Sequence, residues 1–176
     1  MSISVVDIGS STFDDTIPGP GISIPGPGIS IPIPAIDPMD PTLLGVQVAE
    51  FGLAIEPVND TPGSFNYVHL HGTVGIDVPF LSTSTVRLTV ITQRFDIPDQ
   101  PEVILFSVEE SAVVNTFLTG RQLLNFNFSQ GGVNRPLVSG YFRYALFLQN
   151  IAILPITPPN IVGPIEFFGT SYSRNI

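Results

Sequence analysis

A repeated segment rich in proline, glycine and isoleucine constrains the fold of this chain more than any other feature. The heptad IPGPGIS occupies residues 17–23, recurs at 24–30 and is followed by the variant IPIPAID at 31–37. Each proline removes a backbone N–H donor and clashes with the preceding helical turn, so the segment cannot form a helix and must run extended. Its glycines do not fall at every third position, which excludes a collagen triple helix.

The isoleucines distinguish this segment from a solvated linker, which would be polar or rich in glycine and serine. They stand at Ile17, Ile22, Ile24, Ile29, Ile31, Ile33 and Ile36. Apolar side chains on a stiff, extended chain gain free energy when they pack against protein. We therefore expect these isoleucines to dock between subunits, and residues 1–41 to form an extended Pro/Gly/Ile-rich connector arm that reaches a neighbouring copy.

The composition changes at residues 37–41, Asp-Pro-Met-Asp-Pro, where we place the boundary between the arm and a head domain at 42–176. Beyond this hinge, short runs rich in β-forming residues are separated by turn residues, and no stretch has the period of an amphipathic helix. The expected strands cover residues 43–56, 67–78, 85–95, 103–108, 123–128, 138–153 and 165–172. Residues 113–118 fit either a strand or a helical turn, and 2–7 and 22–24 can pair as short strands.

This pattern predicts an all-β protein, an antiparallel β-sandwich of jelly-roll type with about eight or nine strands. In residues 123–128 the apolar Leu124, Phe126 and Phe128 should point inward, and Asn125 and Asn127 outward. The run at 138–153 is apolar on both faces, so we expect it to be covered on both sides. An immunoglobulin-like sandwich is the alternative, but the chain lacks the cysteine and tryptophan markers of that fold.

The charge distribution argues against several classes of partner. The formal net charge is −9, all six basic residues are arginine, and the arm contains no basic residue. The acids of the arm are Asp7, Asp14, Asp15, Asp37 and Asp40. Nucleic acids and anionic membranes both require clustered cations, so neither is an expected partner. Charged residues make up only 12% of the chain and lysine is absent, which suits a protein packed in a dense assembly.

Two further absences bear on where the protein acts. The chain has no cysteine, which excludes disulfides and thiol chemistry. Residues 1–7 lack the basic region and long apolar core of a secretory signal peptide, and no run reaches the ~18 to 20 apolar residues that span a bilayer. We nevertheless expect an extracellular location, on a cell or spore surface, reached by another route.

No set of residues indicates catalysis. His69 and His71 share one face of an expected strand and Asp77 follows, but a metal site needs a further ligand and the chain has no third histidine. Glu109 and Glu110 are adjacent, so in a strand they would face opposite ways and could not act as a carboxylate pair. The glycines of the heptads precede no lysine and no helix, unlike a phosphate-binding loop. We expect no enzyme activity, no metal and no cofactor.

The layout of the chain resembles bacterial spore-surface proteins. The resemblance is carried by the leader at 17–41, the missing signal peptide, and the strand sequences FRYALF at 142–147 and IEFFG at 165–169. The chain is similar in these respects to subunits of fine endospore appendage fibres and to the trimeric jelly-roll heads of exosporium collagen-like proteins. The resemblance implies heads that form trimers and connectors that insert into the next trimer of a filament, with a tip or anchor protein as a further partner. The leader lacks a Gly-X-Y tract, which leaves no collagen stalk.

The sequence therefore favours a non-enzymatic, self-assembling structural subunit. A second hypothesis is a receptor- or glycan-binding head on an appendage, with Tyr67, His69, Tyr141 and Tyr172 as stacking residues. A third is a viral jelly-roll capsid or decoration protein, since such proteins also use N-terminal arms to lock neighbours together.

Overall fold

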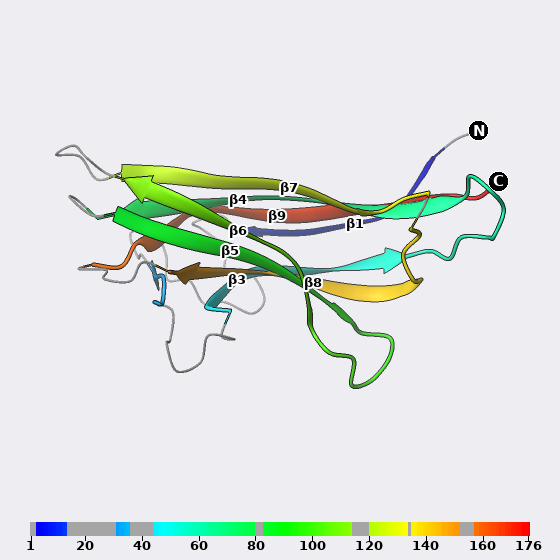
Figure 1. Ribbon diagram of the computed structural model, residues 1–176, viewed down its shortest axis with the longest axis horizontal. Helices are drawn as coiled ribbons and strands as arrows, with labels where there is room; N and C mark the ends of the chain where they lie inside the picture. The colour runs from blue at the N-terminus through cyan, green and yellow to red at the C-terminus, as the bar shows by residue number, and fades with distance from the viewer. Residues whose placement is uncertain are drawn as a thin grey trace.

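The structure is a computed structural model that describes residues 3–13, 31–35, 44–79, 83–113, 120–133, 135–151 and 157–176. These residues form an all-β protein in which two antiparallel sheets pack face to face (Figure 1). The predicted antiparallel β-sandwich is confirmed. Both heptads at 17–30, the hinge at 37–41 and residues 114–119 lie outside the described residues.

Nine strands occur in the described part of the chain. They are β1 (Ser4–Phe13), β2 (Ile31–Pro32), β3 (Val46–Ile55), β4 (Phe65–Val78), β5 (Thr83–Arg94), β6 (Val103–Val113), β7 (Gly120–Gly131), β8 (Gly140–Asn150) and β9 (Asn160–Arg174). The first sheet has the order β1-β9-β4-β7, with β2 paired to β9, and the second sheet has the order β3-β8-β5-β6.

The pairing is nested: the consecutive strands β5 and β6 form the innermost pair, and the partners in each further pair lie progressively farther apart in sequence. Strand β1 pairs with β9, β3 with β8, β4 with β7 and β5 with β6, so the two halves of the chain lie side by side in both sheets. Figure 1 shows the blue β1 beside the red β9 in the same layer. The first sheet is complete only with β9, the last strand of the chain, and the second only with β8.

The core lies between the sheets and follows the two-residue period of the strands. Val68, Leu70 and Val74 of β4 are fully buried, as is Phe167 of β9. The Phe51 ring of β3 lies 4.5 Å from the Phe167 ring, which joins the two layers. Aromatic contacts of this kind add to the free energy gained from burial alone.

Several sequence predictions are confirmed by this packing. Leu124 and Phe126 of β7 are buried, whereas Asn125 and Asn127 are exposed. On β8, the neighbours Ala145 and Leu146 are both fully buried although they point to opposite faces, so the middle of this strand is covered on both sides as expected, whereas Tyr141 near its start is exposed.

Two predicted strand ends are wrong. Strand β6 continues past Glu109 and Glu110 to Val113. The Arg87 guanidinium of β5 donates two hydrogen bonds to Glu109, from Nε at 3.1 Å and Nη2 at 2.8 Å, so the carboxylate is paired across the strands and does not end them. Such cross-strand ion pairs stabilise a sheet at its solvent-facing side.

Strand β9 begins at Asn160, five residues before the expected start at Ile165. It passes through Pro164. The register between β4 and β9 shifts between Val74 and Ile76, so the proline falls at an irregularity where it displaces no ladder hydrogen bond. The backbones of β4 and β9 approach closely at this irregularity, and only glycine fits at position 75, because a Cβ atom there would lie 1.8 Å from the carbonyl oxygen of Gly163.

Candidate functional site

The described part of the Pro/Ile segment, residues 31–35, is bound at a defined position in the sandwich, which we call the seat of Ile33. The Ile33 side chain is fully buried and belongs to the hydrophobic core. Its backbone N–H donates to the carbonyl of Pro159 at 2.8 Å, and the carbonyl of Pro34 accepts from the N–H of Asn150 at 2.8 Å. Residues 31–35 therefore lie between the end of β8 and the start of β9 and bond to both.

The alternation of isoleucine and proline fits this seat. Proline has no N–H, so an extended chain with Pro32 and Pro34 can donate only from the residues between them. Ile33 donates at that position, and the Pro34 carbonyl supplies the acceptor on the other side. Ile31 pairs with Ile161 in the short strand β2 and is partly buried.

The predicted docking residues are thus only partly described. Ile31 and Ile33 pack on the sandwich of their own chain. The remaining five, Ile17, Ile22, Ile24, Ile29 and Ile36, lie outside the described residues. Strand β1, also within the predicted arm, pairs with β9 from Ser4 to Phe13 and overlaps the expected pairing segment 2–7 at residues 4–7.

Strand β1 closes one corner of the sandwich through Asp7. The carboxylate oxygen Oδ2 of Asp7 accepts the backbone N–H of Ala54 on the edge strand β3 at 2.8 Å. The Ser171 hydroxyl of β9 donates to the carbonyl of the same Ala54 at 2.7 Å. Both edge groups of Ala54 are therefore satisfied by side chains from the opposite sheet. From composition, Asp7 is only one of the acids of the arm. The β-bulge beside it, between Val5 and Asp7, directs its side chain toward β3.

Elsewhere the edge strands present apolar side chains to solvent. Strand β6 is the free edge of the second sheet, and Val103 and Ile104 on it are more than half exposed. At the edge of the first sheet, Val5 and Ile8 of β1 are similarly exposed. Unpaired edge strands with apolar side chains are templates for association with another chain.

The outer face of the first sheet groups aromatic and histidine side chains from three strands, and we call it the tyrosine–histidine face. It is made of Tyr67, His69 and His71 of β4, Phe168, Thr170 and Tyr172 of β9, and Asn127 and Ser129 of β7. The rings of Tyr67 and Tyr172 stack at 4.7 Å with an interplanar angle of 14°, and those of His71 and Phe168 lie 4.9 Å apart.

Hydrogen bonds fix the two imidazoles on this face. Nδ1 of His69 lies 2.9 Å from the Ser129 hydroxyl, and Nδ1 of His71 lies 2.8 Å from the Asn127 side-chain oxygen. Among the described residues, no group of three or more His, Asp or Glu side chains is placed to hold a metal ion. Asp77, the third residue of the weighed metal site, stands opposite Arg121 in the register of β4 and β7.

Three of the four predicted stacking residues come together on the tyrosine–histidine face: Tyr67, His69 and Tyr172. Tyr141 does not join them, because it lies on β8 in the other sheet. It is 47% exposed, and its hydroxyl occupies the space that a Cβ atom on Gly52 of β3 would need.

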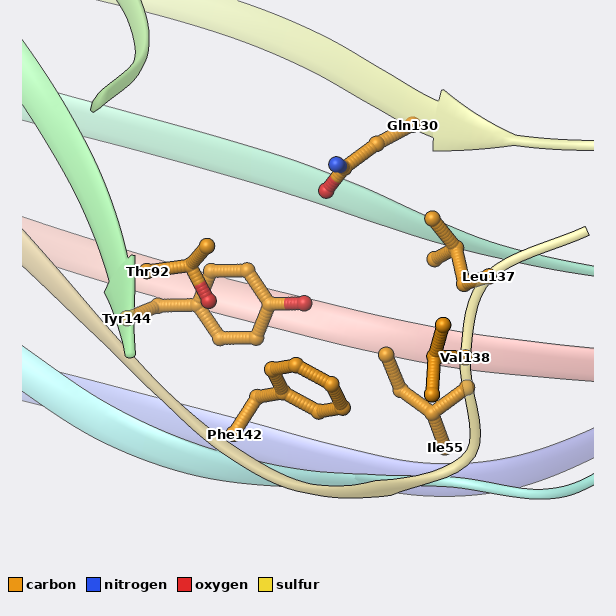
Figure 2. Close-up of a pocket in the computed structure, with 7 residues that line it drawn as sticks. All are labelled: Ile55, Thr92, Gln130, Leu137, Val138, Phe142 and Tyr144. Carbon is orange, nitrogen blue, oxygen red and sulfur yellow. The ribbon is translucent and has the colours of Figure 1, made fainter. Parts of the chain in front are cut away.

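A cavity of about 180 Å³ lies between the sheets. Figure 2 shows its lining, which consists of Ile55, Thr92, Gln130, Leu137, Val138, Phe142 and Tyr144. Burial raises the pKa of Tyr144 well above its usual range, and a hydrogen bond with Thr92 opposes the shift in part. The phenol is therefore neutral at physiological pH and serves as a hydrogen-bonding group, not as a base.

No protein-family model matches the chain, and no curated protein is significantly similar to it in sequence. The structure assigns the protein to the class of antiparallel β-sandwiches. In the ranges that the structure covers, no helix is long and apolar enough to cross a membrane.

Proposed function

We propose that this protein is a structural subunit that self-assembles by lending its N-terminal segment to a neighbouring copy. The observation that carries the proposal is the seat of Ile33, an isoleucine of the Pro/Ile segment that is fully buried and held by backbone hydrogen bonds on both sides. A head that contains such a seat can accept the same residues from another chain with the same contacts.

Whether a head binds its own Pro/Ile segment or that of a neighbouring chain depends on the length of the residues that connect the segment to the head. Residues 36–45 join the seated segment to β3 and contain Pro38 and Pro41. Ten residues span up to about 35 Å when extended, which is comparable with the ~35 to 40 Å width of a domain of this size. A connection of this length would allow the segment to make in an adjacent head the same contacts that it makes in its own. Exchange of an identical element is a low-cost route to assembly.

The strand order supports a finer assignment of the head. Pairing of strands from the two ends of the chain, in sheets β1-β9-β4-β7 and β3-β8-β5-β6, is what results when one long hairpin is rolled into two layers. We infer a jelly-roll head, stacked as trimers in a filament on a cell or spore surface, with a tip or anchor protein at its end. The trimer, the filament and the location rest on the resemblance described above.

A cross-linking experiment tests the exchange directly, because the natural chain has no cysteine. Ile8 of β1 and Thr170 of β9 are direct partners in the sheet, a geometry within reach of a disulfide. The double variant Ile8→Cys/Thr170→Cys is assembled, oxidised and run on a denaturing gel without reductant. We expect a ladder of covalently joined chains. Assemblies that dissociate into internally bridged single chains would show that β1 stays in its own head and would overturn the proposal.

A truncation provides a second test. Removal of residues 1–37 deletes the donated segment, and we expect electron micrographs to show short particles or isolated heads instead of filaments. Circular dichroism on the same sample reports whether the truncated head retains β-structure. Filaments of normal length from the truncated chain would contradict the proposal.

A further inference from the structure

We propose that the tyrosine–histidine face binds an uncharged oligosaccharide chain. This site is separate from the seat of Ile33 and does not depend on self-assembly. The inference rests on the register of β9, β4 and β7, the neutrality of the face, and its mixture of aromatic rings with hydrogen-bonding groups.

The register arranges the side chains in three parallel rows across the sheet. One row contains Tyr172, Tyr67 and Gly131; the second contains Thr170, His69 and Ser129; the third contains Phe168, His71 and Asn127. Strands are ~4.8 Å apart and alternate residues along a strand are ~6.6 Å apart. The rows therefore offer positions at regular spacing across the sheet, which suits an extended polymer of similar units.

The Tyr67 ring has a side-chain neighbour on β9 but none on β7. Tyr67 stacks on Tyr172 at 4.7 Å, but its partner on β7 is Gly131, which has no side chain. A flat apolar group can lie beside the Tyr67 ring over this glycine. The C–H face of a sugar ring has that shape, and contact with an aromatic face gains both dispersion energy and the burial of apolar surface.

The polar groups of the face complement hydroxyls. Nδ1 of His71 lies 2.8 Å from the side-chain oxygen of Asn127, and in the tautomer that donates to this oxygen, Nε2 of the ring is an acceptor. The side-chain amide nitrogen of Asn127 and the hydroxyl of Thr170 add donors within the same rows. A sugar carries hydroxyls around an apolar ring face, so it can satisfy both kinds of group at once.

Charge selects this ligand over others that stack on aromatic rings. The three rows contain no Asp, Glu, Lys or Arg, and the rows that flank them carry one charge of each sign, Arg174 opposite Phe65 and Glu166 opposite Thr73. A nucleic acid would require cations for its phosphates, and the chain as a whole has a formal charge of −9. An uncharged glycan incurs no such electrostatic penalty, and its binding should depend little on salt.

The experiment uses the full-length chain and four probes: soluble hexamers of β-linked glucose and of β-linked N-acetylglucosamine, and insoluble cellulose and chitin. Calorimetry measures the hexamers, and sedimentation measures the solids. We expect at least one probe to bind, with an affinity that changes less than about twofold between 50 and 500 mM salt. Tyr67→Ala and Tyr172→Ala should each weaken binding about tenfold, because each removes one aromatic contact.

Two matched variants complete the design. Tyr141→Ala removes an exposed tyrosine from the opposite sheet and should leave binding unchanged, and Tyr67→Phe keeps the ring and should retain most of the affinity. Thermal melting checks that each variant is folded. Three outcomes would overturn the proposal: no probe binds the folded chain, Tyr141→Ala weakens binding as much as Tyr67→Ala, or the alanine variants alter filament formation and leave glycan binding intact. The last would show that a second copy covers this face. The cysteine cross-linking test above has a separate readout, so the two proposals can fail independently.

Discussion

Replacement of Ile33 by alanine tests how firmly the Pro/Ile segment is held. Ile33 is fully buried, and the change removes three carbon atoms, each of which contributes about 0.8 kcal/mol when buried. The cavity left behind adds to this transfer term, and measured losses for isoleucine to alanine fall at about 2–5 kcal/mol. The hydrogen bonds at this position are backbone bonds and remain. We therefore expect the free energy of unfolding to fall by about 3 kcal/mol, equivalent to a melting temperature about 6–12 °C lower for a chain of this length.

Urea unfolding followed by circular dichroism, at a concentration where the protein is not assembled, measures this loss. Ile3→Ala is the control, since Ile3 belongs to the same N-terminal region but is 53% exposed. It should change the free energy of unfolding by less than about 0.5 kcal/mol. Equal unfolding midpoints for the two variants would show that Ile33 is not seated, and the proposed exchange would then lose its physical basis.

Three further predictions concern the sandwich itself. Asp7→Ala should lower the free energy of unfolding by about 1–3 kcal/mol, because the N–H of Ala54 loses its acceptor; Asp7→Asn keeps a side-chain oxygen and should lose less in the same urea titration. Gly75→Ala should cost on the order of 3 kcal/mol, because its Cβ would collide with the backbone of Gly163, and a melting temperature equal to that of the natural chain would contradict the close approach. The raised pKa of Tyr144 means that the unfolded chain loses this proton near pH 10 while the folded chain keeps it, so stability should fall as the pH rises above ~10; Tyr144→Phe should show a shallower fall in alkaline melting experiments.

The head could be predicted from sequence because its strands alternate. From Leu124 to Ser129 of β7, apolar and polar residues alternate, as half-buried antiparallel strands require. Strand β1 does not follow this rule: Val5 and Ile8 point to solvent, whereas Gly9 is buried beside the Phe51 ring. In this strand isoleucine lies outside and glycine inside, which is the reverse of the usual hydrophobic pattern. Neither the full extent of β1 nor its pairing with β9 could therefore be predicted from the sequence.

The grouping of the candidate binding residues was also only partly accessible. His69 and His71 share a face by their spacing alone, whereas Tyr172 lies about a hundred residues away in the chain. It meets Tyr67 because the register of β4 and β9 makes them direct partners. Register depends on how the whole sheet closes, so no local pattern places Tyr172 on this face or Tyr141 on the other.

The two proposed roles make different demands on the N-terminal segment. The tyrosine–histidine face is built from β4, β7 and β9, and β1 adds Val5, Ile8 and Ser10 at its rim. A head that has given away its own β1 and received a neighbour's therefore keeps the same face. Exchange would also turn the bond between Asp7 and Ala54 into a contact between subunits. Because this bond forms in only one register of β1, it would fix how far each donated segment slides into the next head, and hence the spacing of heads along the assembly.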